Sequence, residues 1–331
     1  MLTYRLTSRR NIQSFEVPCP VPEEGQQLLK ITSVGICGSD LHWFSEGEIG
    51  DATLENPLVL GHEFAAITQD GIRVAVDPSS PCLRCEVCQK GHPNLCPNVR
   101  FAGHGSIDGA LREWMAWDRN CFFPIPDAMS NEEAAMLEPL GVAIHAVDLA
   151  HLKIGMTVAI FGSGPIGLLI LQLVKLSGAI PVLVTDRLQH RTESALQFGA
   201  DQSVMVSASL DRSVLRELLG TRGVDVAFEV AGDQCAVDDA FEAVTLGGKV
   251  VLVGIPGDDH THFSASLARR KGVTIKMVRR MKFTYPRAID LVSMGSVDVR
   301  SLITHRFPLA QTQQAFETAE RRDGLKVIIN I

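Results

Sequence analysis

The sequence lacks both a long hydrophobic segment and an excess of basic residues. Its longest apolar run, residues 166–174, is broken by Gln172, whereas a membrane-spanning helix needs about 20 consecutive apolar residues. Residues 1–12 have mixed polarity and no apolar centre, so we expect no signal peptide. The formal net charge is −7, which offers no basic surface for nucleic acid. These absences argue against a membrane or nucleic-acid partner.

A disulfide framework is not expected either. The chain has eight cysteines, but they are bunched rather than spread along its 331 residues. Large chains without a secretory signal seldom depend on disulfides. Cys19, Cys121 and Cys235 follow no pattern and are interpreted as ordinary core or surface residues. We therefore expect the protein in the reducing cytoplasm.

Length and composition favour a globular protein of more than one domain. Hydrophobic residues make up 46% and charged residues 21% of the 331 positions, which is an ordinary globular balance. Residues 1–138 contain short strand patterns bounded by Pro, Gly and Asp, among them 27–33, 72–76 and 110–115. They predict an irregular, β-rich domain.

The pattern changes at residue 139, where apolar runs begin to alternate with helical patterns. We predict strands at 158–161, 182–185, 203–206, 224–230, 249–255 and 273–278. Near-continuous apolar strands are typical of a parallel sheet covered on both faces. The fold class is therefore α/β, with a doubly wound, six-stranded parallel sheet over residues 139–278. Residues 279–331 return to mixed character and end in a strand pattern at 326–331, which could rejoin the first domain.

A glycine-rich motif predicts a nucleotide site in the second domain. Gly162, Gly164 and Gly167 fit Gly-x-Gly-x-x-Gly between a predicted strand and the apolar helical run 168–176. Glycines there permit a tight turn and bring backbone N–H groups close to a pyrophosphate. Pro165 suits the first helical turn. The alternative is a plain strand-to-helix turn.

Asp186 ends the next predicted strand, about 20 residues after Gly167, where an acidic residue binds the adenosine ribose hydroxyls. A carboxylate there repels a 2′-phosphate and favours NAD over NADP. Arg187 and Arg191 weaken this preference, because a nearby cation can accommodate the phosphate. Alternatively, Asp186 caps the following helix.

Four cysteines predict a structural zinc site. Cys82, Cys85, Cys88 and Cys96 follow Cys-x2-Cys-x2-Cys-x7-Cys in a loop rich in proline and glycine. Four thiolates form a closed tetrahedral zinc site, and zinc binding can fold a loop that has no core of its own. His92 lies inside the motif and is interpreted as a bystander.

A second zinc site is predicted from Cys37, His62 and Glu63. One thiolate, one imidazole and one carboxylate leave a position open, as catalytic zinc requires. Ser39 and His42 follow Cys37 closely, so a hydroxyl and an imidazole could pass a substrate proton to solvent. An isolated buried cysteine or histidine more often has a structural role. The presence of Ser39 and His42 beside Cys37 favours a catalytic metal site instead.

Together these motifs resemble the zinc-dependent medium-chain alcohol dehydrogenases along the whole chain, and the sorbitol (polyol) dehydrogenase branch in particular. The resemblance rests on Gly-Ile-Cys-Gly-Ser-Asp-Leu-His, Gly-His-Glu, the four-cysteine lobe, Glu138-Pro139-Leu140, the glycine motif and the segment 304–309, in this order. It implies a GroES-like catalytic domain over residues 1–138, a Rossmann domain over 139–278, and a return to the catalytic domain over 279–331. It also implies two zinc ions and NAD as cofactors, a small-molecule substrate, and a homo-oligomer that is a dimer or a tetramer. Residues 273–278 are an apolar sheet-edge candidate for self-pairing.

The resemblance also implies roles for individual residues. Cys37, His62 and Glu63 would ligate catalytic zinc, with Glu138 as a further ligand or as the holder of its water, and Ser39 and His42 would relay the proton. The implied NAD contacts are Gly162, Gly164, Ile166, Gly167, Asp186, Arg191, Val253, Gly254, Ile255, Val278 and Arg279. The implied substrate contacts are Ser39, Trp43, Glu138, Arg279 and Arg280.

Two departures from this branch stand out. Residues 65–71 form an unusually short connection, interpreted as a trimmed hairpin, and Arg279–Arg280 stands where polyol dehydrogenases commonly have Arg-Tyr. Since adjacent strand residues point to opposite faces, we expect only one of the two arginines to face substrate, and the resemblance to the polyol enzymes favours Arg279. The sequence thus predicts an NAD-dependent oxidation of a secondary alcohol of a polyol or sugar derivative to a ketone. Alternatives are a threonine, sugar-acid or sugar-phosphate dehydrogenase, or a non-catalytic relative, against which the intact zinc motif argues.

Overall fold

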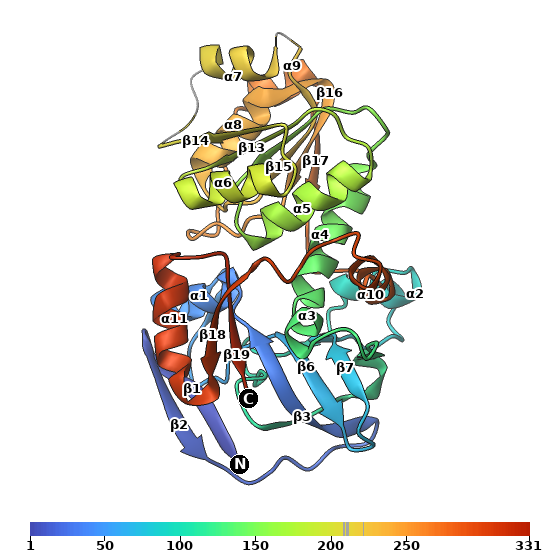
Figure 1. The fold of residues 1–331 in the computed structure, drawn as a ribbon, viewed down its shortest axis with the longest axis vertical. Helices are drawn as coiled ribbons and strands as arrows, with labels where there is room; N and C mark the ends of the chain where they lie inside the picture. The colour runs from blue at the N-terminus through green and yellow to red at the C-terminus, as the bar shows by residue number, and fades with distance from the viewer. Residues whose placement is uncertain (208, 210–211, 221) are drawn as a thin grey trace. The chain divides into compact units, whose positions relative to one another are not determined.

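The computed structural model describes residues 1–207, 209, 212–220 and 222–331. It divides into two compact units (Figure 1): unit 1 contains Met1–Gly141 and Met281–Ile331, and unit 2 contains Val142–Arg280. The boundaries predicted at 138/139 and 278/279 lie just before these two divisions. Within the described residues, none of the helices combines the length and apolarity that crossing a membrane would take.

Unit 1 is built on a seven-stranded sheet in the order β11-β7-β6-β3-β19-β18, with β10 also paired to β3. The strands are β3 Gln26–Gly35, β6 Glu63–Thr68, β7 Arg73–Val76, β10 Trp114–Asp118, β11 Phe122–Pro124, β18 Ile303–Pro308 and β19 Lys326–Asn330. Antiparallel pairing of β19 with β3, where Ile329 lies opposite Val34, joins the end of the chain to the first sheet.

The remaining elements of unit 1 surround this sheet. They are the hairpin β1 Leu2–Ser8 and β2 Asn11–Glu16, the short pairs β4 Glu48–Ile49 with β5 Ala52–Thr53 and β8 Ser79–Ser80 with β9 Arg100–Phe101, and the helices α1 Gly38–Glu46, α2 Glu86–Gln89, α3 Asn131–Ala135, α10 Tyr285–Ser293 and α11 Thr312–Arg321. Helix α4, Leu137–Ala150, begins in unit 1 and continues into unit 2. Buried aliphatic and aromatic side chains from β3, β6, β10, α1 and α11 form one core, including Leu29, Phe44, Phe64, Trp117 and Phe316.

Unit 2 is a six-stranded parallel sheet in the order β14-β13-β12-β15-β16-β17, as predicted. Its strands are β12 Val158–Phe161, β13 Val182–Asp186, β14 Gln202–Met205, β15 Val224–Glu229, β16 Val244–Leu252 and β17 Thr274–Met277, and its further helices are α5 Pro165–Leu176, α6 Gln189–Gln197, α7 Arg212–Leu219, α8 Gln234–Ala243 and α9 Ala265–Lys271. The strand order reverses between β12 and β15, and ligands of such sheets bind at this point. Strands β14 and β17 lie at the edges and are half-buried or exposed, unlike the continuous burial their apolar runs predicted.

Two predicted strands are displaced, and one displacement changes an inference. The run 110–115 is largely not a strand, because Ala110 and Leu111 donate backbone hydrogen bonds to Gly61 and Leu60 instead of joining the sheet. The last parallel strand ends at Met277, so Arg279 and Arg280 follow it, and Arg280 has a left-handed φ of 54°. Strand alternation therefore does not apply to Arg279 and Arg280, and the expectation based on it was wrong. The short connection after Gly-His-Glu is the tight β6–β7 hairpin.

Candidate zinc and nucleotide sites

The predicted open metal site comes together through the pairing of β3 with β6. Gly35 at the end of β3 lies opposite Glu63 at the start of β6. Cys37, the N-cap residue of α1, follows two residues later. As a result, the ligand atoms of Cys37, His62 and Glu63 all lie within 4.8 Å of one another. His62 and Glu63 are 5% and 1% exposed, so a bound ion would be shielded from solvent on their side.

Asp40 orients two of these three residues. Its Oδ1 lies 3.3 Å from Nδ1 of His62, and its Oδ2 accepts a hydrogen bond of 3.0 Å from the backbone N–H of Cys37. The backbone N–H of Gly61 donates to Oδ1 at 3.2 Å. With Nδ1 engaged in this way, Nε2 of His62 is the nitrogen left for a metal. A carboxylate behind a ligating histidine fixes the ring and raises its basicity.

Electrostatics couple Asp40 and His62 strongly. Burial by itself would raise the pKa of Asp40, but attraction to His62 and the N–H donors of Cys37 and Gly61 hold this pKa below its usual value. Burial would lower the pKa of His62, but the Asp40 and Cys37 charges raise it well above its usual value. The site is thus built to stabilise positive charge at its centre.

The negative charge of Glu63 is balanced by a lysine from the far end of the sequence. Lys326, at the start of β19, forms an ion pair with the Glu63 carboxylate, and the two side chains are 4% and 1% exposed. Burial by itself would lower the pKa of Lys326, but Glu63 and Cys37 raise it above its usual value. Gly35 is required beside this pair, because a Cβ there would collide with the Glu63 carboxylate.

Glu138 lies near this centre but outside the group of three. It sits in the first turn of α4 and is 5% exposed. Burial raises the pKa of Glu138 to about 8. The charge of His62 opposes this rise, and the negative charge of Glu63 adds to it. Its carboxyl oxygens are not among the ligand atoms that lie within 4.8 Å of one another. Direct ligation by Glu138 stays a prediction.

The predicted proton-relay residues lie along α1. Ser39 Oγ is 3.3 Å from Nε2 of His62. His42 Nδ1 is 2.9 Å from Oε2 of Glu46, one turn further along the helix. Trp43 is 1% exposed and packs in the core of unit 1, with its ring edge-on to His104 at 5.6 Å between centroids. This placement gives Trp43 a packing role, and its contact with substrate stays a prediction.

The residues present fit a catalytic zinc. One sulfur, one imidazole nitrogen and one carboxylate form a mixed N, S, O donor set with a position left open. The imidazole is orientated from behind by Asp40, which is the arrangement expected of a metal-ligating histidine.

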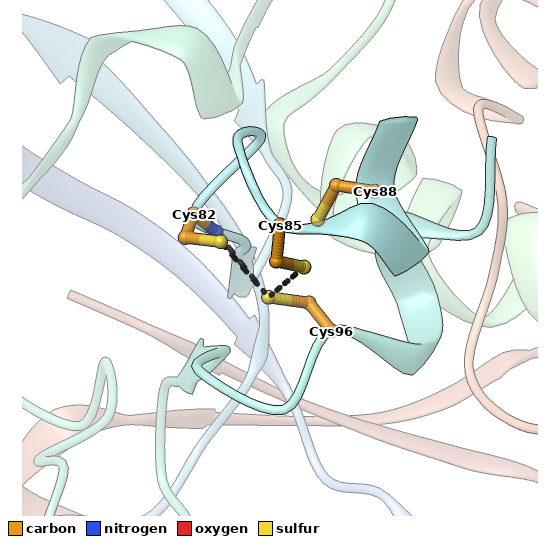
Figure 2. Close-up of side chains that lie close together, drawn as sticks. All are labelled: Cys82, Cys85, Cys88 and Cys96. Carbon is orange, nitrogen blue, oxygen red and sulfur yellow. Dashed lines mark hydrogen bonds between the residues drawn. The ribbon is translucent and has the colours of Figure 1, made fainter. Parts of the chain in front are cut away.

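The four-cysteine group fits the closed type of site. Cys82, Cys85, Cys88 and Cys96 surround α2, and Figure 2 shows their sulfur atoms converging on one point. Cys96 Sγ lies 3.5 Å from Cys82 Sγ and 3.9 Å from Cys85 Sγ. A tetrahedron with Zn–S bonds of about 2.3 Å has edges of about 3.8 Å. The spacing of the sulfurs therefore matches a zinc ion held by four thiolates.

Backbone donors favour thiolate formation at one end of this group. The N–H groups of Arg84 and Cys85 lower the pKa of Cys82 to about 6, whereas burial and the neighbouring thiols raise the pKa of Cys88 to about 12. Four adjacent thiols cannot all ionise without a cation between them, so metal binding must release protons. His92 is exposed, with its Nδ1 3.2 Å from Lys282 Nζ, in keeping with its interpretation as a bystander.

The glycine motif forms the tight turn between β12 and α5. Gly162 has a φ of 110°, and Gly164 is the N-cap residue of α5. A Cβ on Gly167 would collide with the carbonyl oxygen of Gly162, and a Cβ on Gly162 would approach Ala231 N to 3.0 Å. The glycines therefore permit close packing of the turn on the helix and on the loop after β15. They leave the N-terminus of α5 open to a phosphate.

Asp186 connects this turn to the end of β13. Its Oδ2 accepts a hydrogen bond of 2.7 Å from Ser163 N, and its Oδ1 accepts one of 3.0 Å from Leu188 N. The carboxylate thus organises the loop locally, and each oxygen retains a lone pair for a ribose hydroxyl. Ribose binding and local capping are therefore compatible roles.

The arginines beside Asp186 have different positions. The guanidinium of Arg191 faces the start of α5, where a Cβ on Gly164 would lie 3.3 Å from Nη1. Arg187 instead pairs with Asp233 at 3.0 Å. A glycine turn, an open helix N-terminus, a guanidinium and a carboxylate suit the pyrophosphate and ribose of a dinucleotide.

The remaining predicted cofactor residues follow the carboxyl ends of the parallel strands. Val253 and Gly254 donate backbone hydrogen bonds to Glu229 O at 2.8 and 3.2 Å, and Val278 donates to Leu252 O at 2.9 Å. Ile255 comes next after β16 and is 47% exposed, and Ile166 lies in the first turn of α5. Arg279 is exposed after β17. All of these ends meet at the edge of the sheet where such folds bind ligands.

Sequence reasoning missed three residues that organise the sites. Asp40 could have been found, since it stands three residues after the N-cap Cys37, the spacing of a capping box. Buried Glu229 accepts N–H groups of Ala231 and Gly232, both at 2.7 Å, but a lone acid at a strand end is a weak signal. Lys326 carried no signal, because its partner Glu63 lies in a distant segment.

Two family models of dehydrogenases match this chain, one in each half. Residues 23–127 match the alcohol dehydrogenase GroES-like domain, and residues 165–294 match the zinc-binding dehydrogenase family. A sorbitol dehydrogenase of Bacillus subtilis is 37% identical over 332 residues, with 97% of this chain and 94% of the relative covered. A zinc-binding dehydrogenase structure from Sinorhizobium meliloti, bound to NADP, has a TM-score of 0.90 at 31% identity, with 100% and 99% of the two chains covered. An L-idonate 5-dehydrogenase structure from Escherichia coli has a TM-score of 0.89 at 27% identity and covers 98% of that chain and 100% of this one.

Proposed function

Given that this chain belongs to the zinc-binding alcohol dehydrogenases, we propose that it oxidises a secondary alcohol of a neutral polyol to the ketone with NAD. A polyol dehydrogenase-like activity agrees with its sorbitol dehydrogenase relatives. The observation that carries the proposal is the open group of Cys37, His62 and Glu63, with Asp40 behind His62. Such a donor set leaves room for a substrate oxygen.

Cys37, His62 and Glu63 would hold the catalytic zinc, and Cys82, Cys85, Cys88 and Cys96 would hold the structural one. When bound, catalytic zinc supplies a Lewis acid for the alcohol oxygen, and NAD accepts the hydride. The protein residues contribute orientation and proton transfer. Asp40 holds the His62 ring in one orientation, and Lys326 balances the charge of Glu63 inside the protein.

The substrate proton would leave by way of α1. The Ser39 hydroxyl lies beside His62 and is the first protein group placed to accept a hydrogen bond from the alcohol. His42 lies one turn further towards solvent and is the general base of the relay. Both residues come from one helix face, because positions three apart are neighbours on a helix.

NAD is proposed in preference to NADP for two reasons. Asp186 places a negative charge at the end of β13, where the ribose binds. Arg187, the cation next to it, already pairs with Asp233. The structure of a relative of similar fold contains NADP, so kcat/KM should be measured with both cofactors.

The proposed assembly is a homodimer or homotetramer, and the proposed compartment is the cytoplasm. Strand β17 at the edge of the unit 2 sheet presents unpaired backbone groups and supports self-association. The eight cysteines are free, which agrees with a reducing compartment.

A panel of substrates tests the proposal. NADH formation would be measured with polyols, sugar acids, sugar phosphates and threonine, using zinc-loaded protein and either cofactor. We expect the highest kcat/KM with a neutral polyol and NAD. A higher value with a sugar acid or sugar phosphate would select the second candidate, which the consecutive Arg279 and Arg280 favour, since guanidinium groups bind carboxylates and phosphates well. A preference for threonine would reject both.

A further inference from the structure

Helix α1 carries a row of polar side chains that leads from the open metal site towards solvent. Ser39, His42 and Glu46 occur at spacings of three and four residues, so they share one face of the helix. Ser39 is half-buried and lies 3.3 Å from His62, whose side chain is 6% exposed. Further along the row, the exposed fraction of the side chain is 23% for His42 and 44% for Glu46.

Glu46 makes a specific contact at the outer end of this row. Its Oε2 lies 2.9 Å from Nδ1 of His42. A carboxylate can only accept a hydrogen bond, so Nδ1 carries the proton when the imidazole is neutral. Nε2 is then the nitrogen with a free lone pair. The contact therefore selects the tautomer in which a base is available at Nε2.

The position of Glu46 is unfavourable for the helix itself. It is the last residue of α1, which has no basic residue in its last turn, and the negative end of the helix dipole disfavours a carboxylate there. The nearby Glu320 is engaged elsewhere, with Ser45 at 2.6 Å and with Arg10 at 2.8 Å. Helix stability therefore does not explain the acid at position 46, and its contact with His42 does.

We propose that Glu46 is a positioning residue of the proton relay, which holds His42 as the Nδ1–H tautomer and receives the relayed proton on its way to solvent. This inference deepens the proposed dehydrogenase function and rests on it. During oxidation the alcohol O–H bond breaks and its proton reaches Nε2 of His42. The Nδ1 proton passes to the Glu46 carboxylate and then to water. The electron pair of the C–H bond leaves as hydride to NAD, so protons and electrons balance.

The test compares Glu46→Met with Glu48→Met in the full-length, zinc-loaded protein. Methionine has no acceptor oxygen but has a similar length and a similar helix propensity to glutamate. Glu48 lies in β4, is exposed and is not part of α1. We expect Glu46→Met to lower kcat/KM for the best alcohol about tenfold, the size expected from the loss of one charge-assisted hydrogen bond. Glu48→Met should leave it unchanged. Thermal stability of Glu46→Met should equal or exceed that of the wild type, because an unfavourable charge has gone from the end of the helix.

Three further measurements separate positioning from a structural role. Glu46→Gln keeps a side-chain carbonyl acceptor but cannot take up a proton, so it should keep the Nδ1–H tautomer of His42 and recover only part of the activity. In a His42→Gln background, Glu46→Met should have no further effect, because residues that act as a unit are not additive. In ¹⁵N-histidine NMR spectra of the substrate-free protein, the His42 signals should shift from the Nδ1–H tautomer to a mixture in Glu46→Met.

Two outcomes would overturn the inference. One is equal kcat/KM for Glu46→Met and Glu48→Met, and the other is an unchanged tautomer of His42. A wild-type protein that oxidises no alcohol in the panel would reject the proposed function instead. The NMR measurement would still decide whether Glu46 controls the tautomer, so the two failures are distinguishable.

Discussion

Asp40 Oδ1 lies 3.3 Å from Nδ1 of His62, with side-chain exposures of 0% and 6%. The same carboxylate accepts the backbone N–H of Cys37. One buried side chain therefore positions two of the three residues of the open metal site, on two different elements.

Asp40→Asn should weaken the catalytic site without unfolding the protein. The asparagine keeps the size of the side chain but loses the charge that raises the pKa of His62. We expect about a 10- to 100-fold loss in kcat/KM or in zinc affinity at this site. Asp70→Asn, on the exposed β6–β7 hairpin, is the matched control. Unchanged zinc content and activity in Asp40→Asn would remove the orienting role.

The two zinc sites should respond differently to the loss of a cysteine. Elemental analysis should find two zinc ions per chain in the wild type and one in each of Cys37→Ser and Cys88→Ser. Cys37→Ser should abolish turnover with little change in Tm. Cys88→Ser should lower Tm or solubility, because four thiolates hold the loop around α2. A wild type with one zinc ion, together with a Cys88→Ser protein that behaves like it, would disprove the structural site.

Cofactor preference should depend on two carboxylates in unit 2. Asp186→Ala removes the charge that repels a 2′-phosphate, and Asp233→Ala releases Arg187 from its ion pair. In both variants we expect the ratio of kcat/KM for NAD to that for NADP to fall, by a factor of about ten for each 1.4 kcal/mol of lost discrimination. Asp238→Ala, on the exposed face of α8, serves as the control. Comparable activity of the wild type with both cofactors would show that the neighbouring arginines outweigh Asp186.

Substitution of Arg280 should show whether the substrate is neutral or negatively charged. Arg280→Tyr restores the residue that polyol dehydrogenases commonly have at this position. If the substrate is a neutral polyol, this change should leave polyol turnover nearly unchanged and should have little effect on the already low turnover of an acidic sugar; the NADH assay over the substrate panel measures both. Polyol turnover that barely changes while turnover of an acidic sugar collapses would replace the neutral-polyol proposal with the charged alternative.

Asp225 should make the stability of unit 2 depend on acid pH. Burial by itself would raise its pKa, but the N–H and hydroxyl of Thr157, at 2.8 and 2.9 Å, and Arg222 lower it below its usual value of 3.8. A depressed folded-state pKa stabilises the protein above the unfolded value, and this contribution is lost as pH falls through the folded value. Asp225→Asn should cost about 1–3 kcal/mol at neutral pH.

Thermal melts of Asp225→Asn and wild type across pH 2–7 measure this effect. The difference in Tm should be several degrees at pH 7 and should vanish in strong acid. Asp238→Asn controls for the loss of a surface charge. A difference that is constant with pH would assign the effect to packing.

Sequence reasoning predicted best where the relevant residues are close together in the chain. The four cysteines span residues 82–96, and the glycine motif spans residues 162–167 between two regular elements. Their chemistry depends on local spacing, which a linear sequence records. The interior strands of unit 2 were equally clear, because burial on both faces requires continuous apolar residues. The edge strand β17 was predicted less well, because its residues are only half-buried or exposed. It ends at Met277, so Arg279 and Arg280 lie outside it and do not alternate between its faces.

The sequence by itself determined the α/β class, the four-cysteine motif and the dinucleotide turn, because each depends on patterns and spacings within continuous stretches of the chain. Only the tertiary structure decided which distant residues meet. The register of β3 against β6 carries Cys37 to His62 and Glu63, and the return of β19 to β3 supplies Lys326 to Glu63. Strand register depends on the packing of whole sheet faces, and no short segment contains that information.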